Sequence, residues 1–140
     1  GHRYNGRILA RHLARAHFGV DPERPVLRTA DVIPFLLGEL TNGPELWHQK
    51  AYLARVLRPD PARGIVDDGV WPLAHFLDSG GPDAVAATME ENVAGDIYPC
   101  LYVRRGGDVR EVVLPPDPLL DYRTTDNGRL LAEAIGPLLA

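Results

Sequence analysis

Cysteine, serine, lysine and long apolar runs are nearly absent from this sequence. Cys100 is the only cysteine, which excludes an internal disulfide and a zinc site built from several thiolates, and agrees with a reducing compartment. Ser79 is the only serine and lies outside the Gly-x-Ser-x-Gly motif of many hydrolases. No apolar run approaches the roughly 18 residues that cross a bilayer, and the first residues lack the apolar segment of a signal peptide. We therefore expect a cytoplasmic protein without a membrane partner.

The sequence does contain an ordinary share of apolar residues, 45% of a chain of 140. This length is that of one domain, and we expect a single globular domain over residues 1–140. The chain begins Gly1-His2 without methionine, which suggests that residues 1–2 are a cloning scar or that the chain is an excised domain. The 14 glycines and 13 prolines exceed their usual share and predict many turns.

Charge is distributed unevenly along the chain. Residues 1–20 contain four arginines and no acid, whereas residues 64–103 contain seven acids and no lysine or arginine. The four arginines occupy one side of a predicted amphipathic helix, with Leu9 and Leu13 on the other side. This basic stripe consists of Arg3, Arg7, Arg11 and Arg15. A net charge of −4 argues against nucleic acid as a partner. We expect the stripe to face water or the carboxylates of this chain or of a second copy.

Apolar spacing and proline positions predict several helices. Proline-rich joints at 21–25, 58–61 and 115–118 divide the chain into four pieces. A first helix is expected over 31–41 with Asp31 as its cap, because its apolar residues recur at the spacing of one buried face. Further helices are expected over 44–57, from 81 to about 92, and from about 126 to the end.

Two segments rich in β-branched and aromatic residues, 97–104 and 109–114, predict a β-hairpin. They flank Arg105-Gly-Gly-Asp108, whose glycines supply the positive φ angles of a tight turn. Asp68-Gly69 predicts another turn, and a short apolar element follows at 71–77. With helices first and one late hairpin, the expected class is α+β, a mainly helical domain with a C-terminal helix.

The residues with reactive side chains favour structural roles. Lys50 lies on the apolar side of the predicted helix 44–57, where its stem is expected to pack while the ammonium reaches water. Cys100 is expected to be a buried thiol, because no cationic neighbour would activate it. Ser79-Gly-Gly81 precedes a predicted helix, but flanking aspartates would repel an anion there, so a turn is favoured.

Three carboxylates and an imidazole lie within twelve residues, at Asp67, Asp68, Asp78 and His75. These are ligand types for a divalent cation, but their spacing matches no known metal motif. We expect neither a metal nor a cofactor.

Glu90 and Glu91 fall near the C-terminus of the predicted helix 81–92. The helix macrodipole disfavours negative charge there by a few tenths to about 1 kcal/mol each, so a cationic partner would be stabilising. We therefore predict that the basic stripe and these two glutamates form an interaction surface.

These features favour a non-enzymatic protein-interaction or assembly domain that self-associates as a homodimer or docks a partner. An accessory role beside a larger enzyme is one form that such a domain takes. One alternative is a small enzyme or ligand-binding protein. Its candidate pocket residues are His48, Lys50, Asp67, Asp68, His75, Tyr98 and Tyr102. A second alternative is a winged helix-turn-helix regulator, with helices 31–41 and 44–57 as the pair and the 97–114 hairpin as the wing.

Pairing between the basic stripe and the acidic residues predicts self-association that weakens with salt. Size-exclusion chromatography with light scattering is expected to give a larger mass at about 0.01 M salt than at about 0.15 M, where the Debye length has shortened to about 8 Å. Replacing Glu90 and Glu91 with glutamine is expected to reduce the mass at low salt. An equal mass under both conditions would contradict charge pairing.

Overall fold

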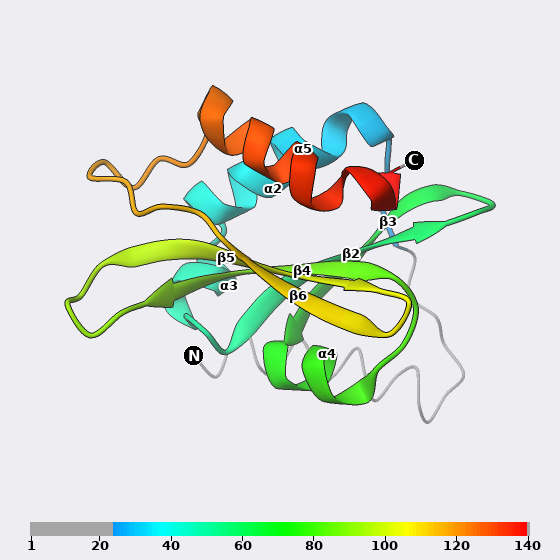
Figure 1. The fold of residues 1–140 in the computed structure, drawn as a ribbon, viewed down its shortest axis with the longest axis horizontal. Coiled ribbons are helices and arrows are strands. Elements are labelled where there is room, and N and C mark those ends of the chain that lie inside the picture. Colours follow the sequence, from blue (N-terminus) through cyan, green and yellow to red (C-terminus); the bar gives the residue numbers. More distant parts are fainter. Residues whose placement is uncertain (1–23, 140) are drawn as a thin grey trace.

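The structure, a computed structural model, describes residues 24–139, which form six strands and four helices (Figure 1). In chain order these are β1 (Val26–Leu27), α2 (Thr29–Asn42), α3 (Pro44–His48), β2 (Leu53–Asp60), β3 (Gly64–Pro72), α4 (Leu73–Ser79), β4 (Ala84–Glu91), β5 (Ile97–Arg105), β6 (Asp108–Val113) and α5 (Thr125–Leu139). The strands form one antiparallel sheet in the order β1-β3-β2-β4-β5-β6. The expectation of a mainly helical fold is therefore wrong, although helices and strands do combine as an α+β structure.

The prediction of one helix over residues 44–57 is wrong. α3 ends at His48, a turn with Ala51 at φ 61° follows, and β2 begins at Leu53. β2 is a central strand with apolar residues on both faces, so its sequence lacks the alternation that marks a half-buried strand. Its buried residues are Leu53, Ala54, Val56 and Leu57. The winged-helix hypothesis is left with only the five residues of α3 as a recognition helix.

The segment predicted as helix 81–92 contains the strand β4 instead. Its alanines are good helix formers, but here the strand lies between β2 and β5 in the sheet and its three alanines are buried. The macrodipole argument for Glu90 and Glu91 is therefore wrong. Glu90 accepts a hydrogen bond of 2.9 Å from the Tyr102 hydroxyl, and Glu91 is exposed at the end of the strand. Asp68-Gly69, predicted as a turn, lies within β3.

Three predicted elements are confirmed, namely α2, the β5–β6 hairpin and α5. Gly106 and Gly107 form the hairpin turn with φ of 58° and 90°, as the two-glycine pattern predicts. α2 begins earlier than expected, so Asp31 lies in its first turn and pairs with Arg28 at 2.9 Å rather than capping the helix.

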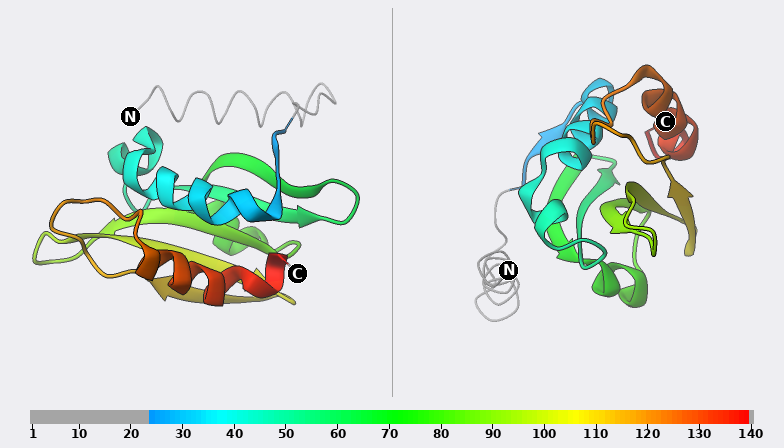
Figure 2. Two further views of the ribbon diagram at one scale, coloured as in Figure 1. Left: turned by 90° about the horizontal axis from the view of Figure 1, so that it is seen from above. Right: turned by 90° about the vertical axis from the view of Figure 1, so that its left-hand side faces the viewer.

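α2 and α5 lie side by side on one face of the sheet, and α4 lies on the other (Figures 1 and 2). The larger hydrophobic core fills the space between the sheet and α2, α3 and α5. A smaller core lies under α4, where Phe76 packs near Val56 and Ala86. Within residues 24–139, no helix combines the length and apolar character needed to cross a membrane.

Truncation of a buried leucine in α2 tests the larger core. Leu40 is fully buried, so Leu40→Ala is expected to lower the free energy of unfolding by about 2–5 kcal/mol. Leu130→Ala removes the same atoms from α5 at a position that is 38% exposed, and a loss of less than about 1 kcal/mol is expected. Urea unfolding followed by circular dichroism measures both. Equal losses would contradict this assignment of the core.

Candidate functional site

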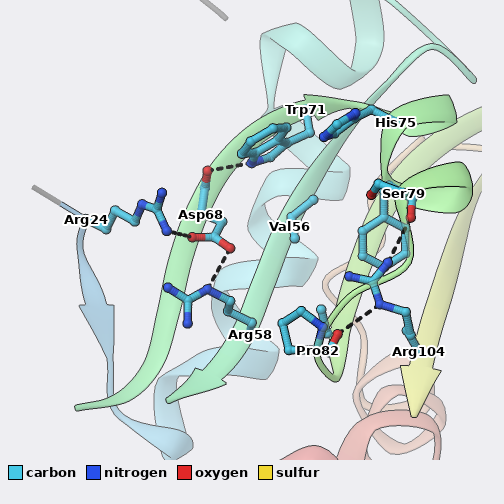
Figure 3. Close-up of a pocket in the computed structure, with 11 residues that line it drawn as sticks. Arg24, Val56, Arg58, Asp68, Trp71, His75, Ser79, Pro82 and Arg104 are labelled. Carbon is cyan, nitrogen blue, oxygen red and sulfur yellow. Dashed lines mark hydrogen bonds and ion pairs between the residues drawn. The ribbon is translucent and has the colours of Figure 1, made fainter. Parts of the chain in front are cut away.

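A pocket of about 360 Å³ opens on the sheet face that carries α4 (Figure 3). Its walls come from β2, β3, α4, β4, β5 and the segment before β1. The volume falls within the range of small-molecule pockets, about 300–1,000 Å³. The apolar walls include Val56, Phe76, Pro82 and Ala84. The charged and aromatic residues that line the pocket are Arg24, Arg58, Asp68, Trp71, His75 and Arg104.

A β-bulge in β3 brings Asp68 and Trp71 to the same face. Asp67 and Gly69 pair with consecutive residues of β2, so Asp68 is the extra residue of the bulge. Side chains alternate along a strand, and without the bulge positions 68 and 71 would point to opposite faces. The extra residue shifts this alternation, and both side chains line the pocket.

Asp68 holds two arginines along one wall of the pocket. The carboxylate accepts a hydrogen bond of 2.7 Å from Nη1 of Arg24 and one of 2.9 Å from Nε of Arg58. The three side chains are only 12–22% exposed, so water screens these ion pairs less than it screens a surface pair. One carboxylate thus fixes two guanidinium groups.

Arg104 forms the opposite wall and is held by neutral groups. Its Nε donates to the carbonyl of Pro82 at 2.9 Å and its Nη1 donates to the carbonyl of Phe76 at 2.8 Å. The guanidinium carbon lies 4.2 Å from the centre of the Phe76 ring, within the range of a cation–π contact. Burial lowers the pKa of Arg104, and the charge of Asp83 opposes that change. Within residues 24–139, Arg104 forms no salt bridge.

Trp71 and His75 stack against each other beside these charges. Their ring centres are 5.2 Å apart and their planes differ by 9°. The indole Nε1 of Trp71 donates to the carbonyl of Asp68 at 2.9 Å. Because α4 begins directly after β3, the end of the strand and the first turn of the helix bring the two rings together. They provide a flat part of the pocket lining.

Among the described residues, arginines outnumber acids in the pocket lining. Three arginines and one aspartate line it, although the whole chain has a net charge of −4, and Asp60 outside the lining lies 3.9 Å from Arg58. Low-dielectric walls strengthen the local field, so the pocket attracts an anionic group. Its one hydroxyl from a serine, that of Ser79, donates to the carbonyl of Gly80 at 3.2 Å. The arrangement is therefore suited to binding an anion, and it holds no serine paired with a base.

The pocket brings together two of the candidate ligand residues from the sequence, Asp68 and His75. Asp67 lies on the opposite face of the sheet, 3.8 Å from Nη1 of Arg55, and accepts a hydrogen bond of 2.8 Å from the Gly69 amide. Adjacent aspartates therefore act on opposite sides of the sheet.

The other candidate ligand residues lie outside the pocket. His48 ends α3, and Lys50 lies in the turn after it, donating from Nζ to the carbonyl of Trp47 at 3.0 Å. Tyr98 and Tyr102 lie on β5, and Tyr102 packs against the smaller core. Burial raises the pKa of Tyr102, and its hydrogen bond to Glu90 acts in the same direction.

Sequence reasoning missed Arg24, Arg58 and Arg104 as site residues. Arg24 and Arg58 fall in proline-rich joints, where we expected only chain breaks. A signal for Arg104 was present, since it lies on the same face of the predicted strand as Cys100, which was expected to be buried. A charged residue on the buried face of a strand is a candidate for function.

The predicted interaction surface is only partly described by the structure. The arginines at positions 3, 7, 11 and 15 lie outside the described residues, so their pairing with Glu90 and Glu91 stays a prediction. Among the residues that the structure describes, no group of three histidine, cysteine or acidic side chains is arranged to hold a metal ion.

Comparison of the chain with protein families, with curated proteins and with solved structures finds no significant match.

Cys100 is expected to be unreactive in the folded protein. The thiol is buried in β5 and donates from Sγ to Oε1 of Glu111 at 3.4 Å, and burial raises its pKa to about 12. Since the thiolate is the reactive form, Ellman's reagent at about pH 8 should label the chain in urea and leave the folded chain unlabelled over the same time. Equal labelling rates would contradict this burial.

The same shift predicts a loss of stability in alkali. The pKa of the folded thiol lies above its ordinary value of 9.0, so the unfolded chain loses this proton first as the pH rises. The contribution of the protonated Cys100 thiol to the free energy of unfolding is therefore complete below about pH 9. It is lost between about pH 9 and pH 12. Urea unfolding of the wild type and of Cys100→Ala at pH 8 and pH 10 should show a larger loss for the wild type. Equal losses of unfolding free energy in the two proteins would contradict the raised pKa of Cys100.

Proposed function

We propose that this chain is a non-enzymatic protein-interaction domain that docks an acidic segment of a partner protein on the sheet face carrying α4. The observation that carries the proposal is the excess of three arginines over one aspartate among the described residues that line a pocket of an otherwise acidic chain. Charge of this kind steers an acidic partner and selects against a basic one.

The way the arginines are held also supports docking. Arg58 is fixed by Asp68, and Arg104 is fixed by two backbone carbonyls and the ring of Phe76. Side chains that are already ordered lose little conformational entropy when a partner binds. Arginine beside aromatic and apolar surface is also typical of the residues that dominate binding energy in protein interfaces.

A second candidate function is the binding of a small anionic molecule in the same pocket. The observation that favours it is the cavity volume of about 360 Å³, which matches a small ligand. A partner segment makes contacts beyond the pocket, whereas a small anion makes contacts only inside it. Comparing the affinity of a short acidic peptide with that of a free anion therefore distinguishes the two functions.

A fluorescently labelled decaglutamate peptide tests the proposed function. We expect it to bind at low salt, to bind more weakly as salt is added, and to be preferred over decalysine. Arg58→Gln removes one cation of the pocket and should weaken decaglutamate binding about tenfold or more, the scale of a lost charge-assisted hydrogen bond. Fluorescence anisotropy measures each affinity.

Arg110→Gln is the matched control, because it makes the same change of charge on a strand. Arg110 is exposed on β6 and pairs with Val103, which packs in the larger core, so it lies on the other sheet face. Its replacement should change decaglutamate affinity less than about twofold. Equal effects of the two substitutions, or an absence of decaglutamate binding by the wild type, would rule out docking on the α4 face.

A further inference from the structure

The three arginines of the pocket differ in how their charge is balanced. Arg24 and Arg58 share the carboxylate of Asp68. Arg104 is only 6% exposed and has only neutral contacts at hydrogen-bond distance among the described residues. Asp83, the acid that acts on Arg104 electrostatically, accepts a hydrogen bond of 2.9 Å from the amide of Gly106. A buried cation without a carboxylate is costly, and an anionic ligand would offset that cost.

The contacts of Arg104 leave three of its five N–H donors. Nε donates to Pro82 and one N–H of Nη1 donates to Phe76, so the second N–H of Nη1 and both N–H groups of Nη2 remain. Nη2 lies beside Gly81, where a Cβ atom would come within 3.2 Å of it. Gly81, which has φ 129°, therefore leaves room beside this nitrogen that a side chain would fill, and Arg104 lines the pocket. Figure 3 shows Arg104 extending between Pro82 and Ser79 at the pocket wall.

We infer that Nη2 of Arg104 is the carboxylate receptor of the pocket and binds the side chain of a glutamate or aspartate in the partner's acidic segment. This inference rests on the proposed function and names the group that the pocket recognises. A carboxylate offers two acceptor oxygens to these remaining donors, whereas a phosphate group presents three strong acceptor oxygens. Arg24 and Arg58 form the opposite wall, where both pair with Asp68 and Arg58 also lies 3.9 Å from Asp60.

Substitution of Ser79 tests this inference without removing Arg104, whose contacts also hold the end of α4. Ser79 is exposed and lies next to Arg104 at the pocket wall in Figure 3. Ser79→Asp places a carboxylate in the pocket, where it competes for Arg104, and Ser79→Asn is the neutral control of nearly equal shape. We expect decaglutamate affinity to fall about tenfold or more in Ser79→Asp and less than about twofold in Ser79→Asn. Similar affinities of the two variants would overturn the inference.

Nuclear magnetic resonance of the arginine side chains gives a second readout on the unaltered protein. Addition of N-acetylglutamate amide should shift the guanidinium resonances of Arg104 more than those of Arg110, whereas N-acetylglutamine amide should leave them in place. Inorganic phosphate is the comparison for a free anion. Stronger binding of phosphate than of N-acetylglutamate amide would overturn the assignment to a carboxylate.

The failures of the two proposals are distinguishable. If decaglutamate binds through Arg58 but neither Ser79→Asp nor the Arg104 resonances respond, the receptor role of Arg104 is wrong and docking on the α4 face stands. If decaglutamate fails to bind while N-acetylglutamate amide shifts the Arg104 resonances, the carboxylate receptor stands and the docking of a protein segment is wrong. If none of these ligands binds, both proposals are wrong.

Discussion

Burial of one sheet face beneath α2 and α5 is the constraint on which the rest of the structure depends. These two helices, with α3, enclose the larger core, and among residues 24–139 the seven-residue α4 is the helix on the other face. Beside α4, long side chains with apolar stems and charged ends line part of that face. Arginines lie beside Phe76 and Val56 there, so the pocket lining combines positive charge with apolar surface.

Charge balance then divides the pocket into two unlike halves. On one side the bulge of β3 turns Asp68 toward Arg24 and Arg58, which gives a local ion-pair network. On the other side Arg104 ties the end of α4 to the loop before β4 through backbone carbonyls alone. The fold thus stabilises one buried cation with neutral dipoles, and electrostatic attraction for an anion remains.

Local patterns in the sequence were sufficient for α2, α5, the β5–β6 hairpin and the burial of Cys100. The central strands β2 and β4 could not be recognised, because strands buried on both faces lose the alternation that separates them from helices. Asp68 and His75 were identified by residue type, but their meeting with Arg104 depends on strand pairing between distant segments and on the bulge. Neither has a reliable signature in one sequence.

The edge strand β6 also bears on how copies of this chain can meet. Among the strands of residues 24–139, none pairs with its outer side. An antiparallel, two-fold symmetric pairing of two such edges would centre on a single residue, and the central positions of β6 are Arg110 and Glu111. Either register places like charges directly opposite each other, which is destabilising in a sheet. The two registers that use the most of β6 are therefore disfavoured for a continuous sheet between two copies.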